Sequence, residues 1–174
     1  MKYLVKFFVV TFLLLISTHT FADQKIVVLD MKFVLNNSSA GKGAQDFLKK
    51  SFDDNQKKFL ALEQDLKKEE SDLLAKKTIL TKEEYTKKTN GLRKKVIDYQ
   101  SQRRLAMDKI ATQRAESREI LMKKLVPIVD AYIKDNNISL VMYKKTMVGG
   151  LTKYDVTEDI TKRLNKELPS LNLK

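Results

Sequence analysis

The side chains that most often do chemistry in proteins are scarce in this chain. It has no cysteine, and its one histidine, His19, lies close to the N-terminus. The thiol nucleophile, the commonest general base and the usual zinc ligands are therefore missing from nearly all of its length. Five glycines in the whole chain do not form a phosphate-binding loop of the Walker or dinucleotide type. We therefore expect no enzymatic activity, no metal site and no cofactor.

Positive charge is the chemistry that remains. The chain has 34 Lys and Arg against 22 Asp and Glu, a formal net charge of +12. Between Gly41 and Lys124 there are 22 basic residues against 14 acidic ones, so most of the excess lies in the middle of the chain. Such a segment can attract anions or acidic chains, or its charges can simply solvate helices and form pairs four residues apart. The basic patch candidates are Arg93, Lys94, Lys95, Arg103 and Arg104.

The first 22 residues have the pattern of a secretory signal peptide. Lys2 and Lys6 precede an apolar run at 7–16, and "TFA" (20–22) fits a cleavage site. The apolar run has 10 residues, whereas a membrane-spanning helix needs about 20. We expect export and cleavage after Ala22.

Two long helices dominate the rest of the chain. No Pro or Gly occurs from about Ala44 to Lys77, and a second helical stretch runs from Lys82 to about Asp135. Between them, Thr81 and Glu84 in "TILTKEEY" (78–85) form a capping box, which marks the start of a helix. The chain is therefore expected to turn near residues 78–84.

Apolar residues at seven-residue spacing predict how the two helices pair. The first helix repeats from Phe52 to Leu80 and the second from Tyr85 to Ala106, as in coiled coils. If the chain folds back at Thr81, then Leu73 faces Leu92, Leu66 faces Tyr99, and Phe59 faces Ala106. The result is a hairpin arm about 50 Å long, from about 35 residues at about 1.5 Å each. The predicted arm seam is Phe52, Phe59, Leu66, Leu73, Leu92 and Tyr99.

The arm needs a body to anchor it. "KIVVLD" (25–30) and "ISLVMY" (138–143) read as strands, and "NNSSAGKG" (36–43) as a turn before the first long helix. "GG" (149–150) predicts a hairpin into a further strand, "LTKY" (151–154).

A last helix follows these strands. Asp155 and Glu158 read as its capping pair, with Ile160 inward and Pro169 after its end.

These elements give a mostly helical α+β fold with three parts. Residues 1–22 are the signal peptide, 23–40 and 125–174 the β-containing body, and 41–124 the inserted antiparallel coiled-coil arm. A body this small without disulfides is expected to associate with other copies. The oligomer core candidates are Ile26, Val28, Leu140, Met142 and Ile160.

Six apolar residues fall outside the seam and have no evident partner within the arm. Scattered apolar groups among lysines suit weak, multiple contacts with an unfolded chain, although surface leucines also occur without any function. These client-contact candidates are Leu60, Leu74, Ile79, Ile97, Leu105 and Met107.

In the order and spacing of its segments, the chain resembles the Skp/OmpH family of periplasmic chaperones. The similarity lies in the signal peptide, the strand "KIVVLD", the segment "SSAGKG", the tip "LTKEEY", the segment "LVPIVDAYIKDNNISLVMYKK" and "YDVTEDITKRLN". The resemblance implies a jellyfish-like homotrimer in the periplasm. Its arms would hold unfolded outer-membrane proteins without ATP and prevent their aggregation, and some family members are said to bind lipopolysaccharide through basic residues.

Two other functions remain open at this point. A static coiled-coil scaffold of the cell envelope would have the same heptads but a folded partner. A basic nucleic-acid-binding protein would explain the charge, but the export signal, the 14 acidic residues of the arm and the lack of a binding motif disfavour it.

Overall fold

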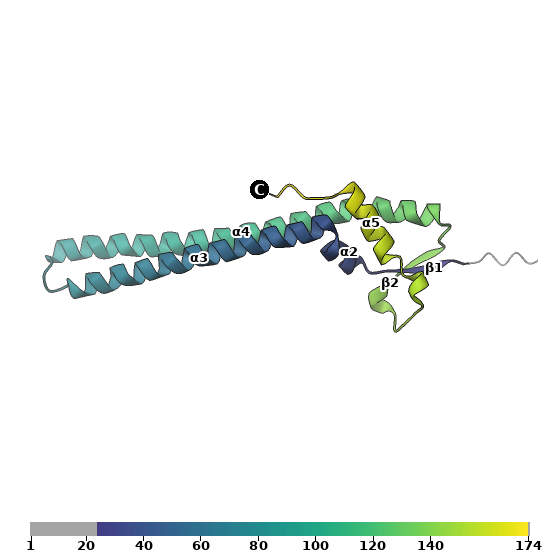
Figure 1. Cartoon of the computed structure of the whole chain (residues 1–174). Coiled ribbons are helices and arrows are strands. Elements are labelled where there is room, and N and C mark those ends of the chain that lie inside the picture. Colours follow the sequence, from purple (N-terminus) through teal and green to yellow (C-terminus); the bar gives the residue numbers. More distant parts are fainter. Residues whose placement is uncertain (1–23, 174) are drawn as a thin grey trace, which may run out of the picture.

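The computed structural model describes residues 24–173, so the predicted signal peptide and its cleavage after Ala22 lie outside the described residues. Two long antiparallel helices extend from a small group of short elements (Figure 1). The long helices are α3 (Ser39–Ala75) and α4 (Lys82–Asp135). The short elements are β1 (Ile26–Leu29), α2 (Met31–Asn37), β2 (Leu140–Tyr143), the 3-10 turns η1 (Lys144–Thr146) and η2 (Thr152–Tyr154), and α5 (Thr157–Glu167).

The tip of the arm has the capping box that the sequence predicts. The Thr81 hydroxyl accepts a hydrogen bond from the Glu84 amide at 3.3 Å, and the Thr81 amide donates to the Glu84 carboxylate at 3.0 Å. Lys76 and Ile79 lie in the turn that joins the helices, and the Ile79 amide donates to the Lys76 carbonyl. The predicted reversal of the chain is therefore confirmed.

The interior of the arm follows the predicted register only approximately. Phe59 and Leu73 are buried, whereas Leu66, Leu92 and Tyr99 are half-buried. The ring of Phe59, expected opposite Ala106, makes an edge-to-face contact with Tyr99 at 5.9 Å between centroids. The long aromatic side chains thus reach along the groove between the helices.

Phe52 departs from the seam prediction. Its side chain is 43% exposed, although the heptad repeat places it inside. It lies near the base of the arm, where it borders an open cleft and not a closed seam.

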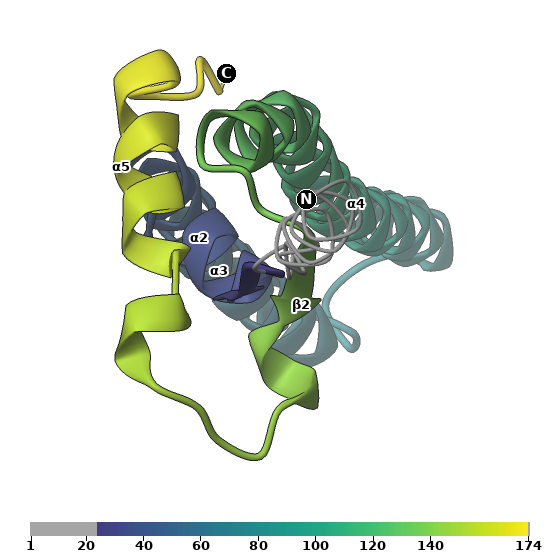
Figure 2. The same ribbon diagram turned by 90° about the vertical axis from the view of Figure 1, so that its right-hand side faces the viewer.

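The two strands are parallel, and the arm is the connection between them. Ile26 pairs with Leu140 and Leu29 with Tyr143, in a sheet of two strands within the described residues. Parallel neighbours need a crossover, and here it consists of α2, α3 and α4. Figure 2, which looks at the body end, shows α5 to the left of the strands and the base of α4 above them.

One apolar core holds the body together. Val27 and Leu29 of β1 point into it, and Leu125 of α4, Ile160 of α5 and Val34 of α2 are fully or almost fully buried there. The core therefore joins the two chain segments at the base of the arm to the last helix.

The turn predicted at 36–43 is wrong in extent. Only Ser38 leaves the helical conformation, because α2 ends at Asn37 and α3 begins at Ser39. The buried Ser38 hydroxyl accepts from the Gly41 amide at 3.1 Å and so caps α3. Gly41 is needed because a Cβ there would lie 1.9 Å from the Leu35 carbonyl oxygen.

The predicted hairpin after Gly149 and Gly150 is also wrong. Residues 152–154 form a 3-10 turn, and the chain returns to β1 for one isolated bridge, between Val28 and Asp155. The Val156 amide donates to the Val28 carbonyl at 2.9 Å, so α5 begins immediately after the single bridge. The predicted strand is therefore replaced by this single bridge.

Candidate functional site

The arm presents cations that few carboxylates neutralise. Four of the five basic candidates are exposed, namely Arg93, Lys94, Arg103 and Arg104. Within the described residues, no carboxylate oxygen lies within 4.0 Å of their charged nitrogens. Lys95 differs, because its ammonium contacts both carboxylate oxygens of a residue on α3, Glu69, at 2.7 Å. Arg93, Lys94 and Arg104 are thus available to an external anion. Arg103 acts weakly on the charge of Glu63, and Lys95 links the two helices.

Near Tyr99, an ion pair within α3 adjoins a hydrogen bond that crosses the arm. Lys67 binds Glu63 at 2.7 Å, and the Tyr99 hydroxyl donates to Glu63 at 3.4 Å. The hydrogen bond and the charge of Lys67, with smaller effects of Tyr99 and Arg103, lower the pKa of Glu63. The carboxylate therefore stays ionised and adds to the polar edge of the seam.

The predicted client-contact residues are exposed, with one exception. Ile79 at the tip is 80% exposed, and Leu60, Leu74, Ile97 and Leu105 are each between 56% and 59% exposed. Met107 is only half-buried in the arm. Large apolar side chains and unpaired cations therefore share the same rod-shaped surface.

The oligomer candidates fall into two groups. Ile26, Leu140 and Met142 are exposed at 40%, 52% and 38% on one face of the sheet. Val28 and Ile160 are buried within this chain at 7% and 0% exposure, so their assignment to a subunit interface is wrong. Ile160 is inward-facing because α5 packs on its own body, and Val28 is covered where the chain returns at Asp155.

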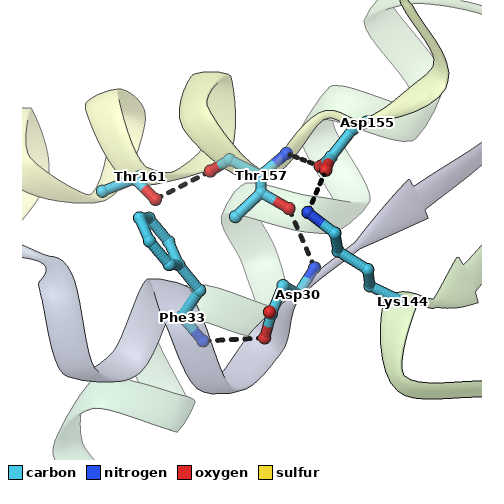
Figure 3. A network of polar contacts seen from close by, with 6 residues as sticks. All are labelled: Asp30, Phe33, Lys144, Asp155, Thr157 and Thr161. Atoms are coloured by element: carbon cyan, nitrogen blue, oxygen red, sulfur yellow. Dashed lines mark hydrogen bonds and ion pairs between the residues drawn. The ribbon is translucent and has the colours of Figure 1, made fainter. Parts of the chain in front are cut away.

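A polar network joins β1, the loop after β2 and α5 (Figure 3). The Asp30 amide donates to the Thr157 hydroxyl at 2.9 Å, and the Thr157 amide donates to Asp155 at 3.0 Å. Lys144 completes it with an ion pair to Asp155 at 2.7 Å. The predicted pairing of Asp155 with Glu158 is replaced, since the Asp155 amide donates to the Thr152 carbonyl.

Asp155 is held in its charged form by this network. Partial burial by itself raises the pKa of the Asp155 carboxyl, but the hydrogen bonds from Lys144 and Thr157 and the charge of Lys144 outweigh it. The net result is a lowered pKa for Asp155 and a raised pKa for Lys144. The sequence suggests the role of Asp155 in capping, but nothing in it marks Lys144 or Asp30 as partners.

A family model described as "Outer membrane protein (OmpH-like)" matches residues 25–164, which include the sheet, the whole arm and most of α5. The chain belongs to the OmpH-like family. The family resemblance inferred from the sequence is therefore confirmed.

Two relatives of this OmpH-like chain support the same assignment. A "Skp-like protein" of Pseudomonas aeruginosa is 24% identical over 166 residues, which cover 95% of this chain and 99% of the relative. A crystal structure from Caulobacter crescentus CB15, described as "a putative outer membrane chaperone (OmpH-like)", matches with a TM-score of 0.80 at 16% identity. The match covers 91% of this chain and 94% of that one, which confirms the mostly helical fold with its small sheet.

Two features are absent from the described part of this OmpH-like chain. Residues 24–173 contain no group of three or more His, Cys, Asp or Glu that could hold a metal ion. None of the helices among them is long and apolar enough to cross a membrane.

Proposed function

We propose that this OmpH-like protein is an ATP-independent holdase chaperone of the periplasm, which binds unfolded outer-membrane proteins and prevents their aggregation. The observation that carries the proposal is the arm surface, where exposed Leu60, Leu74, Ile97 and Leu105 lie among cations without ion-pair partners in the described residues. Each such contact is individually weak, so a client is held at many points and released without a fuel molecule.

Charge supports capture of the client. A net charge of +8 between Gly41 and Lys124 draws in acidic segments and raises association rates, and salt weakens the attraction. We therefore expect the holdase to protect less well at high ionic strength.

The proposal includes a homotrimer, in which three arms surround a client. The exposed apolar face at Ile26, Leu140 and Met142 favours association through the body. Static light scattering of the purified protein should give three times the chain mass. Leu140→Asp would place a charge on that face and should lower the mass, whereas Glu158→Gln, on the exposed side of α5, should leave it unchanged.

The decisive experiment is an aggregation assay with a urea-denatured outer-membrane β-barrel protein. On dilution, a stoichiometric amount of the chaperone should suppress light scattering without ATP. Substitution of the exposed Leu60, Leu74, Ile97 and Leu105 by Ser should remove most of that suppression. Substitution of four exposed alanines, Ala61, Ala75, Ala111 and Ala115, by Ser is the matched control, and it should retain it.

Three results would count against the holdase or against its proposed client contacts. If the wild-type protein leaves the barrel to aggregate, a static scaffold is the better description. If both quadruple variants suppress aggregation equally, the exposed leucines are ordinary surface residues. Tighter binding to lipopolysaccharide or to DNA than to the denatured barrel at moderate salt would favour the basic surface as the functional one.

A further inference from the structure

A cleft lies at the base of the arm, where α3 and α4 meet α2. Its volume is about 700 Å³. The apolar part of its lining comes from three helices, with Leu35 of α2, Leu48 of α3 and Leu121 of α4. All three leucines are buried, so they form a fixed floor.

Phe52 lies beside this floor and is 43% exposed. The heptad repeat places this residue at a seam position, but no described residue makes a ring contact with it. An aromatic face next to a fixed apolar floor can bury a further apolar side chain from a partner. The cleft therefore offers an apolar subsite that the chain itself leaves uncovered.

Cations line the same cleft. Lys49 comes from α3, and Arg114 and Arg118 are four residues apart on one face of α4. Within the described residues no carboxylate oxygen lies within 4.0 Å of any of the three. Asp46 is the one acidic residue of the lining, so the cleft has a local positive charge.

We propose that this cleft binds an aromatic or large aliphatic side chain of an unfolded client together with a carboxylate adjacent to it in the client sequence. The apolar side chain packs on Phe52 and the leucine floor, and the carboxylate binds the guanidinium groups of Arg114 and Arg118. Arginine suits this role because its planar fork of N–H donors matches a carboxylate. A site of this size holds a short segment and not a whole chain.

This inference rests on the proposed function and makes it more specific. The exposed apolar residues of the arm bind a client with little dependence on the client's sequence; these are Leu60, Leu74, Ile97 and Leu105. The cleft adds a preference for client segments in which a large apolar residue neighbours Asp or Glu. Such segments would bind where the arm meets the body.

The test uses two fluorescein-labelled peptides of equal length in a Gly/Ser background. One contains a single Phe-Asp pair and the other a Phe-Asn pair. Fluorescence anisotropy at moderate salt should show the wild-type protein binding the Phe-Asp peptide about tenfold more tightly, as expected for one hydrogen-bonded charge pair. The double variant R114Q/R118Q should lose that preference, and F52A should weaken binding of both peptides.

The control is K57Q/K109Q, which removes two exposed arm cations outside the cleft and makes the same change in net charge. It should keep the tenfold preference. Equal affinity of the wild-type protein for both peptides would overturn the inference. So would an equal loss of preference in the control, because the attraction would then be that of the whole arm.

Two more measurements separate this inference from other outcomes. If R114Q/R118Q or F52A changes the solution mass of the protein, the cleft holds a second copy of the chain and the inference fails. If the wild-type protein keeps the denatured barrel soluble but does not discriminate between the peptides, the cleft proposal fails while the holdase stands. Failure to keep the barrel soluble overturns the holdase itself.

Discussion

Lys144 and Asp155 form an ion pair of 2.7 Å that closes the loop between β2 and α5. The same Asp155 carboxylate accepts the Thr157 amide, and Thr157 in turn accepts the Asp30 amide at the end of β1. One carboxylate therefore connects the strand, the loop and the last helix (Figure 3). The attachment of α5 to the sheet depends on polar contacts as well as on the core around Ile160.

Replacing Asp155 by Asn should destabilise the body. The amide keeps the shape but removes the charge that binds Lys144 and Thr157. Because the Lys144 side chain is 54% exposed, solvent screens the pair, and we expect a loss of about 1 kcal/mol in the free energy of unfolding. Urea unfolding followed by circular dichroism measures it. Glu158→Gln, in the first turn of α5 and exposed, should change the free energy much less.

The Asp155 contribution should depend on pH. The pKa of this carboxyl in the folded protein lies below its ordinary value of 3.8, so the folded state releases the proton more readily than the unfolded state. The stabilisation is then complete above the ordinary value and is lost as the pH falls through the lowered native pKa. The difference in unfolding free energy between wild type and Asp155→Asn should therefore shrink below about pH 4. A difference that grows in acid would contradict the proposed charge state.

Gly41 should be among the least replaceable residues of the chain. A Cβ at this position would lie 1.9 Å from the Leu35 carbonyl oxygen, so α2 and α3 would have to move apart. We expect Gly41→Ala to cost about 2 kcal/mol or more, as overpacking does. Gly43→Ala is the matched control, because nothing lies within 4 Å of its added Cβ. It should stabilise the helix by about 0.5–1 kcal/mol. Thermal unfolding would measure both changes in stability, which should have opposite signs in the two variants.

The arm could be predicted from the sequence because its signals repeat. Phe59, Leu66 and Leu73 recur every seven residues, so an error at one position does not shift the whole pattern. The capping box at Thr81 then defines the start of α4, which spans Lys82–Asp135 as expected. In the arm, the local helix propensity and the pairing of the two helices agree. The sequence pattern alone is therefore sufficient to predict the arm.

The body could be predicted only in part, because its elements are short. The seven residues of α2 do not show a helical period, and only Val34 and Leu35 among them are buried. The strand expected at 151–154 would need a partner along its length, and the structure provides one bridge at Asp155. Local sequence carries no information about which backbone groups remain available for pairing.

The candidate binding residues divide in the same way. The exposure of Leu60 and Leu105 follows from the heptad repeat, since it leaves them off the seam. The sequence predicts that Ile160 faces inward. It does not predict whether this side chain packs in the core of its own chain or against another copy. The cleft beside Phe52 was missed because it needs α2, α3 and α4 together, and no sequence pattern relates Leu35 to Arg118.

The tip of the arm should open when Thr81 is replaced by Ala. The substitution removes the hydroxyl that accepts the Glu84 amide and also donates to the Glu84 carboxylate at 2.9 Å. The pKa of Glu84, which these contacts with Thr81 lower, should rise toward its ordinary value. Loss of a threonine N-cap typically costs about 1 kcal/mol, and the cost should appear as faster hydrogen exchange in the first turn of α4.

The matched control for the tip is Glu83→Gln, which leaves both capping bonds intact. Exchange near Tyr85 should rise in Thr81→Ala and stay close to wild type in the control. Amides near Leu73 and Leu92 should also exchange faster in Thr81→Ala if the cap holds the end of the seam closed. Unchanged exchange at those two residues would mean that seam packing alone joins the helices there, and that the capping box only defines where α4 begins.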